Sequence, residues 1–76
     1  MNNKRRKQIS RVIEQIEDSK ETLADILNDE AQAFDNMPES LLESERAEAS
    51  QNAIDLLDEA INNLDEAINN LEEAQE

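Results

Sequence analysis

The sequence predicts an all-helical fold, an antiparallel hairpin of two long helices in one domain that covers residues 1–76. Three observations support it: apolar residues recur at helical spacing in both halves, the only proline, Pro38, stands at the midpoint, and glycine is absent. We expect the first helix at about residues 4–34, the hinge at about 35–40 and the second helix at about 41–74.

The first helix is predicted from a heptad pattern that begins with Ile9 at position a. Its apolar face is interrupted only at Ser19, Lys20 and Glu30. We place these three residues either at the rim of the interface between the helices or where the packing partner offers few side chains. Lys20 is long enough to reach an acidic neighbour. Asn2 or Asn3 can cap the helix. The apolar residues at positions a, d and e are Ile9, Val12, Ile13, Ile16, Leu23, Ile26, Leu27, Ala33 and Phe34.

The hinge is predicted from the sequence "DNMPES", because Asp35, Asn36 and Pro38 follow the last residue of the first pattern. Beyond the proline, Ser40 and Glu43 have the spacing of a capping box, in which a hydroxyl and a carboxylate satisfy each other's backbone amides. This pair predicts that the second helix begins near residue 40.

The second helix carries the repeat "AINNLDEAINNLEEA", with isoleucine at a, leucine at d, alanine at g and acids at e. Alanine at g lets another helix approach closely. Continued towards the hinge, the same frame places Leu41 and Leu42 at b and c, and Ala47 and Ser50 form a weak a/d pair. We therefore interpret residues 36–50 as a separately built piece that contains a short helical turn.

Homodimerisation is predicted from the width of the apolar stripes. Each stripe is three positions wide, which is more apolar surface than the seam of one hairpin covers, so we expect a four-helix bundle or coiled coil. A core of this size supplies little stability by itself, so a chain of this length needs association, disulfides or a metal. Without cysteine or histidine, neither disulfides nor a zinc site can form. The predicted core and oligomer residues are Ile9, Ile13, Ile16, Leu23, Leu27, Phe34, Ile54, Leu57, Ile61, Leu64, Ile68 and Leu71.

Composition argues against several function classes. No histidine stands beside the serines, and carboxylate pairs such as Asp58-Glu59 lie on a solvated helix face, so we expect no enzyme, no metal site and no cofactor. One aromatic residue and no glycine disfavour direct nucleic-acid binding, and no apolar run is long enough to cross a membrane. Because no apolar segment follows Lys4 to Lys7, we expect a cytoplasmic protein rather than a secreted one.

The net charge of -13 is unevenly distributed, since residues 13–76 hold all twenty acids against Lys20 and Arg46. On a rod of about 45–50 Å this segment presents roughly one net charge per 2.6 Å, within a factor of two of duplex DNA. Such a surface either mimics nucleic acid towards a basic protein or only solubilises a bundle. We expect the basic residues Lys4 to Arg11 to lie beside Glu66 to Glu76; the alternative is an arm that binds nucleic acid or a partner.

Several residues have no obvious role in a plain solvated surface. Leu56 occupies a c position where the later repeats have asparagine, and Met37 stands beside the proline. Leu41 and Leu42 either pack the closed end of the bundle or contact a partner. Arg46, the only cation of the hinge region, and four acids of the repeat complete the predicted partner-binding set. The set comprises Met37, Leu41, Leu42, Arg46, Leu56, Asp58, Glu59, Asp65 and Glu66.

The segment "AFDNMPESLLESERAE", followed by "AIDLLDEAINNLDEAINNLEEA", resembles a group of short acidic proteins from bacteriophages and prophages of Gram-positive bacteria. The resemblance covers most of the chain, and its specific part is Phe34 to Arg46. It implies a protein that acts in the host cytoplasm by binding and inhibiting a host or anti-phage defence protein. The leading hypothesis is therefore an acidic inhibitor that occludes a basic surface, and the alternative is a structural or oligomerisation coiled coil.

Overall fold

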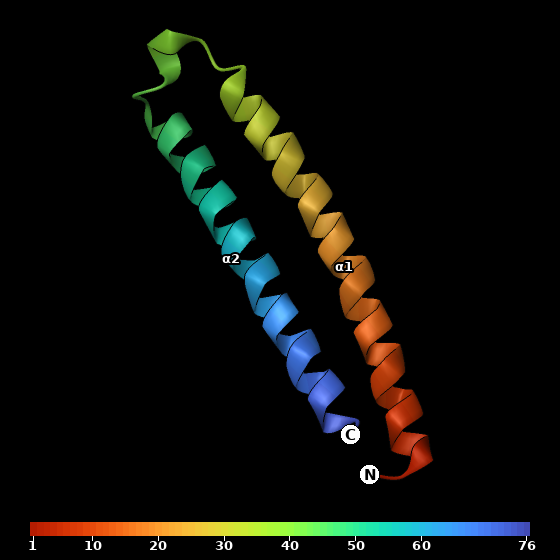
Figure 1. The fold of residues 1–76 in the computed structure, drawn as a ribbon. Coiled ribbons are helices and arrows are strands. Elements are labelled where there is room, and N and C mark those ends of the chain that lie inside the picture. Colours follow the sequence, from red (N-terminus) through yellow and green to blue (C-terminus); the bar gives the residue numbers. More distant parts are fainter.

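The computed structural model describes residues 1–76 and consists of two long helices joined by a short connection (Figure 1). Helix α1 spans Asn3–Asp35, the 3-10 turn η1 spans Glu39–Leu41, and helix α2 spans Glu45–Ala74. There are no strands, and both termini lie at the end opposite the connection. The predicted all-helical hairpin is confirmed.

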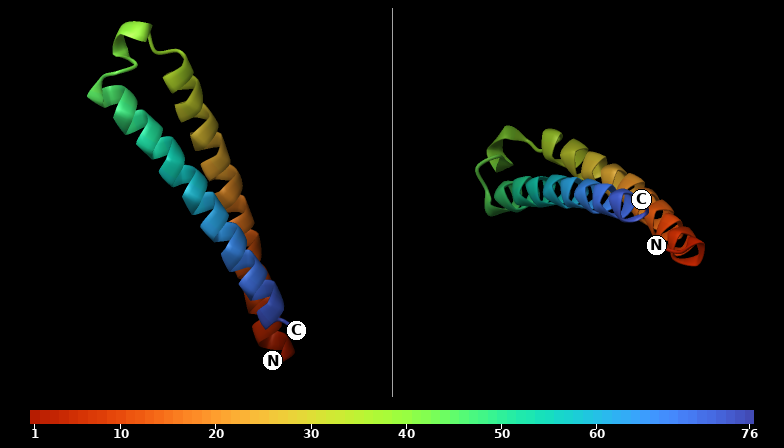
Figure 2. Two further views of the ribbon diagram at one scale, coloured as in Figure 1. Left: turned by 60° about the vertical axis from the view of Figure 1, so that its left-hand side comes forward. Right: turned by 60° about the horizontal axis from the view of Figure 1, so that its bottom comes forward.

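The hairpin is a thin rod. Its Cα atoms extend over 59 × 15 × 12 Å, and the radius of gyration is 17.4 Å, whereas a compact domain of this length has about 11.4 Å. In both views of Figure 2 the helices run beside each other and the pair curves gently. A single layer of two helices leaves each helix with only one neighbour.

The ends of α1 are closed by local hydrogen bonds. Of the two predicted caps the structure uses Asn2, whose side-chain oxygen accepts from the Arg5 amide at 2.8 Å. At the other end the Asn36 amide donates to the Gln32 carbonyl at 3.0 Å, and Asn36 remains in the right-handed helical region. No residue has a positive φ, which is consistent with a turn built without glycine.

The connection turns the chain at Pro38, which has an extended backbone with φ −60° and ψ 146°. A short helical turn follows, as predicted, with the Leu41 amide donating to the Pro38 carbonyl at 2.9 Å. Ser44 is extended again and caps α2: its Oγ accepts from the Ala47 amide at 3.3 Å and donates to the Leu41 carbonyl at 2.5 Å.

The predicted capping box of Ser40 and Glu43, and with it a helix start near residue 40, is wrong. An N-cap residue needs an extended backbone, but Ser40 lies inside the 3-10 turn. Ser44 is the residue that leaves this turn with an extended backbone, so α2 begins at Glu45.

Replacing Ser44 by alanine tests this assignment. We expect Ser44→Ala to lower the free energy of unfolding by about 1 kcal/mol, because the Ala47 amide loses its acceptor. Ser40→Ala is the matched control and should leave stability unchanged, since Ser40 makes no side-chain hydrogen bond. Urea unfolding followed by circular dichroism measures both, and equal effects of the two variants would contradict the assignment.

The seam between the helices is built from positions a and e of α1 and positions a and d of α2. Only Ile13, Ala47, Ser50 and Ile68 are buried, and the other predicted core residues are half-buried. The d positions of α1 lie outside the seam, where Val12 is 42% and Ile26 is 47% exposed. The hairpin therefore covers only part of the apolar surface that the heptads provide.

The interpretation of residues 36–50 as one separate piece is also wrong. The heptad frame of α2 continues to its first turn, and its a and d residues there, Ala47 and Ser50, are 2% and 6% exposed. Ser50 is tied to α1 there by the hydrogen bond from its hydroxyl to Glu30. The separate piece is limited to the connection, residues 36–44.

Candidate interaction surfaces

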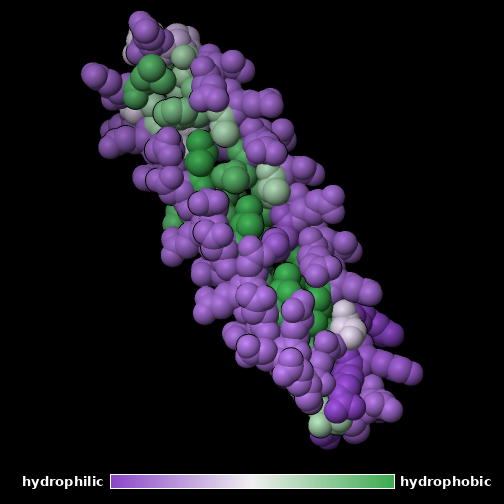
Figure 3. All heavy atoms as spheres, in the orientation of Figure 1, coloured by the Kyte–Doolittle hydropathy of each residue, from purple (hydrophilic) through white to green (hydrophobic).

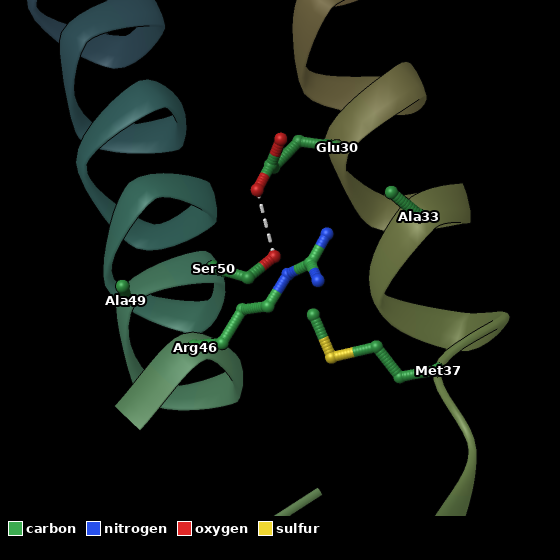
Figure 4. A pocket seen from close by; sticks show the side chains of 6 residues that line it. All are labelled: Glu30, Ala33, Met37, Arg46, Ala49 and Ser50. Atoms are coloured by element: carbon green, nitrogen blue, oxygen red, sulfur yellow. Dashed lines mark hydrogen bonds between the residues drawn. The ribbon is translucent and has the colours of Figure 1, made fainter. Parts of the chain in front are cut away.

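Polar residues hold the two helices in register where the apolar face of α1 is interrupted. Lys20 forms an ion pair with Asp65, which confirms that it meets an acidic neighbour. Glu30 accepts a hydrogen bond from the buried Ser50 hydroxyl at 2.7 Å (Figure 4). The Lys20 and Asp65 side chains are 29% and 49% exposed, so their ion pair contributes little stability, and the Glu30–Ser50 contact is the stronger lock.

A double-mutant cycle measures the coupling energy between Glu30 and Ser50. We expect Ser50→Ala to cost about 1–2 kcal/mol, because the Glu30 carboxylate loses its donor in a half-buried position. Removing both side chains should cost less than the two single changes together, with a coupling of about 0.5–1.5 kcal/mol. Urea unfolding of the four proteins gives the coupling, and strictly additive effects would show that the contact does not stabilise the hairpin.

The chain ends are joined by hydrogen bonds. The Arg6 guanidinium Nε donates to the Gln75 carbonyl at 2.9 Å, and the Gln75 side-chain amide donates to the Arg6 carbonyl at 3.1 Å and to the Ser10 hydroxyl. The basic segment thus lies beside the C-terminal residues, as expected, but it forms no ion pair with them. The only ion pair in the molecule is Lys20–Asp65.

Gln75 and the Glu30–Ser50 pair are contacts that the sequence analysis missed. Gln75 and Ser50 continue positions a and d of the α2 frame, and Glu30 is at position a of α1. A polar residue at a seam position usually sets register by bonding across the seam. That signal was present in the sequence.

The hinge end brings two of the predicted partner-binding residues together. Met37 and Arg46 line a hollow with Glu30, Ala33, Ala49 and Ser50, and Figure 4 shows both side chains between the helices. Leu41 and Leu42 lie outside it on the connection, where they are 38% and 43% exposed.

The remaining predicted residues do not form one patch with Leu56. Leu56 is 65% exposed, but Asp58 lies two residues further along the helix and therefore projects roughly 200° away around the axis. Glu59 and Glu66 are exposed on the outer side of α2, and Asp65 is occupied by Lys20. The predicted set is thus divided between two sides of α2.

One side of α2 holds all of its acids, and we call it the acidic flank. These residues fall at positions b, e and f, and Asp65 alone is paired. Nine acids over about 45 Å of helix give roughly one per 5 Å, against one phosphate per 3.4 Å along a DNA strand. The members are Glu45, Glu48, Asp55, Asp58, Glu59, Asp65, Glu66, Glu72 and Glu73.

Averaged over the whole chain, the charge density is lower than the value for residues 13–76 alone. A net charge of -13 over 59 Å is about one charge per 4.5 Å. The rod is longer than expected, and it includes the basic segment at one end. The acidic flank has a similar spacing, roughly one acid per 5 Å, but its charges lie in a row on one side of a single helix.

The opposite side of the hairpin holds no acid on α2, and we call it the open face. It comprises Val12, Ser19, Ile26 and Ala33 at position d of α1, and Ala49, Ala53, Leu56, Ala60 and Ala67 at positions c and g of α2. Figure 3 looks onto the other side of the hairpin, where hydrophobic atoms form a broken stripe along the seam between hydrophilic outer surfaces.

All three surface hollows of the molecule border the open face. One is lined by Arg5, Gln8 and Val12 near the termini, one by Ser19 and Thr22 at the midpoint of α1, and one by Ala33, Arg46 and Ala49 near the hinge. Each contains a residue at position d of α1, so the hollows repeat with the heptad along one side.

The structure contains no group of three or more histidine, cysteine or acidic side chains that could hold a metal ion. None of its helices combines the length and apolar character that a membrane crossing requires. No protein family, curated protein or solved structure matches the chain.

Proposed function

We propose that this chain is a non-enzymatic inhibitor of phage type that binds a basic, nucleic-acid-binding surface of a host or anti-phage defence protein. The observation that supports it is the separation of charge on α2, where nine acids line one side and none lies on the other. The phage context comes from the resemblance of the segment Phe34 to Arg46.

The acidic flank suits such a role because its carboxylates are held in a row on a helix. Except for Asp65 they form no ion pair, so a partner's lysines and arginines need not displace internal cations. Attraction of this kind raises the association rate and weakens as salt increases. Leu41 and Leu42, exposed at the hinge end, supply apolar contacts beside the row.

We also propose that two copies associate through the open face into a four-helix bundle. One chain exposes 5868 Å², whereas a compact monomer of its mass exposes about 4,700 Å². The excess exceeds the roughly 800 Å² that each partner buries in an interface of standard size. Association on this side leaves the acidic flank of each copy in contact with water.

A displacement assay tests the inhibitor function. Proteins of a Gram-positive host lysate are bound to immobilised duplex DNA at low salt, and the chain is added. We expect it to release a basic protein, and we expect the triple variant Glu59→Gln, Glu66→Gln, Glu73→Gln to need on the order of 10-fold more protein for the same release.

The matched control removes three charges from α1, as Glu14→Gln, Glu21→Gln, Asp25→Asn. All six residues are exposed, so both variants have the same net charge and should fold alike. The control should release as much protein as the unmodified chain. Equal loss in both variants would show that only net charge matters, and no release by any form would contradict the proposal.

The alternative function, a structural coiled-coil element, is favoured by a different observation, the scarcity of buried residues. Only four of the 76 residues are buried in one chain, which suggests that association completes the core. If the chain is only such an element, the α2 triple variant should retain its assembly and no DNA-binding protein should be released.

A further inference from the structure

We propose that the two copies pack open face to open face in antiparallel orientation, with the hinge end of one beside the terminal end of the other and the two-fold axis at Ser19. This inference rests on the association proposed above but not on the partner of the acidic flank.

The side is identified by the exposed apolar residues and by the hollows. Cross-helix contacts pair Lys20 with Asp65 and Glu30 with Ser50, so Ile26 is level with the stretch of α2 that contains Leu56. These residues are 47% and 65% exposed at the same height on the open face. Three hollows open on the same face, at Val12, Ser19 and Ala33, where side chains of a second bundle layer can be accommodated.

Charge selects the orientation. The terminal end combines five cations in residues 1–11 with four acids in residues 66–76, whereas the hinge end, residues 29–50, holds seven acids and only Arg46. Parallel packing would place two hinge ends together, and their like charges would repel. Antiparallel packing places each hinge end beside the unpaired cations Lys4, Arg5, Lys7 and Arg11 of the other copy.

The axis position follows from the length of α1. Ser19 is the midpoint of Asn3–Asp35, and it lies at position d with small side chains and a hollow beside it. An axis through Ser19 places Val12 against Ile26 of the second copy, since the two lie seven residues on either side. On α2 the same axis falls between Ala60 and Ala67, so the alanines allow the two α2 helices to approach closely.

The absence of cysteine makes a direct test straightforward. We compare Ser19→Cys with Ser40→Cys in the full chain. Both serines are exposed, and neither makes a side-chain hydrogen bond. A short dimaleimide is added at low protein concentration, the product is examined on a denaturing gel, and light scattering gives the mass without the linker.

With the antiparallel arrangement, Ser19→Cys should shift from 8.7 kDa to twice that mass and Ser40→Cys should not, because its two copies lie at opposite ends. In a parallel pair the hinge ends coincide, so linking of Ser40→Cys overturns the proposal. A dimeric mass without linking at Ser19 overturns the placement of the axis, and a monomeric mass overturns association altogether. The DNA displacement assay on the linked protein reports separately on the acidic flank.

Discussion

Ile68→Asp is expected to abolish the helical circular-dichroism signal of the protein at 25 °C. Ile68 is 7% exposed and is level with Ile13, which is 8% exposed, and these two are the only large side chains buried in the seam. The substitution removes a buried aliphatic side chain and leaves a carboxylate without a partner, at a combined cost above about 3 kcal/mol. The free energy of unfolding of a domain of this size is no more than a few kcal/mol.

Asn69→Asp is the control, because it adds the same charge one residue further along, at an exposed position. It should melt within a few degrees of the unmodified protein. If Ile68→Asp melted cooperatively at an unchanged temperature, the seam between positions a and e of α1 and positions a and d of α2 would not hold the fold.

Leu56→Asn is expected to weaken association of the two copies by roughly 10- to 100-fold while the helical signal is retained. It installs the residue that the later repeats have at the same heptad position, Asn63 and Asn70. Leu56 contributes little to the hairpin because it is 65% exposed, but in the proposed bundle it lies at the covered face. Sedimentation equilibrium measures the dissociation constant.

Leu57→Asn provides the comparison at the neighbouring position, which is half-buried in the seam. It should destabilise the hairpin itself and lower the helical signal. An unchanged dissociation constant for Leu56→Asn would show that the open face is not the surface on which the copies meet.

The hairpin could be predicted because its two determinants are local. Heptads of isoleucine and leucine specify helices with an apolar stripe, and Pro38 excludes a continuous helix. The contact of Lys20 with an acid could be predicted for a similar reason, since a long cation in the middle of an apolar face must reach a carboxylate at its rim.

The start of α2 and the rotation of α1 could not be predicted in the same way. Ala47 and Ser50 have little hydrophobic signal, although they are among the four buried residues of the chain. Which of positions d and e of α1 enters the seam depends on how the helices rotate against each other. The pattern assigned both to the core, and the structure leaves Val12 and Ile26 at position d exposed.

The sequence pattern placed alanines at g and acids at e on opposite flanks of α2, but the predicted contact set took residues from both sides. That set combined Leu56 as an apolar anchor with Asp58 and Asp65 as charged contacts. Helical geometry places Leu56 away from the two acids, and the cross-helix pair of Lys20 with Asp65 shows which side each helix turns towards its neighbour.

Carboxyl labelling with a carbodiimide, read by mass spectrometry, tests most directly whether the acidic flank makes the partner contact. Labelling is compared between the chain alone and the chain bound to the basic protein that we expect the displacement assay to identify. We predict protection of Asp58, Glu59, Glu66 and Glu73 on binding, with Asp18 and Asp25 of α1 unchanged. Protection centred on α1, or spread evenly over all twenty acids, would contradict the account.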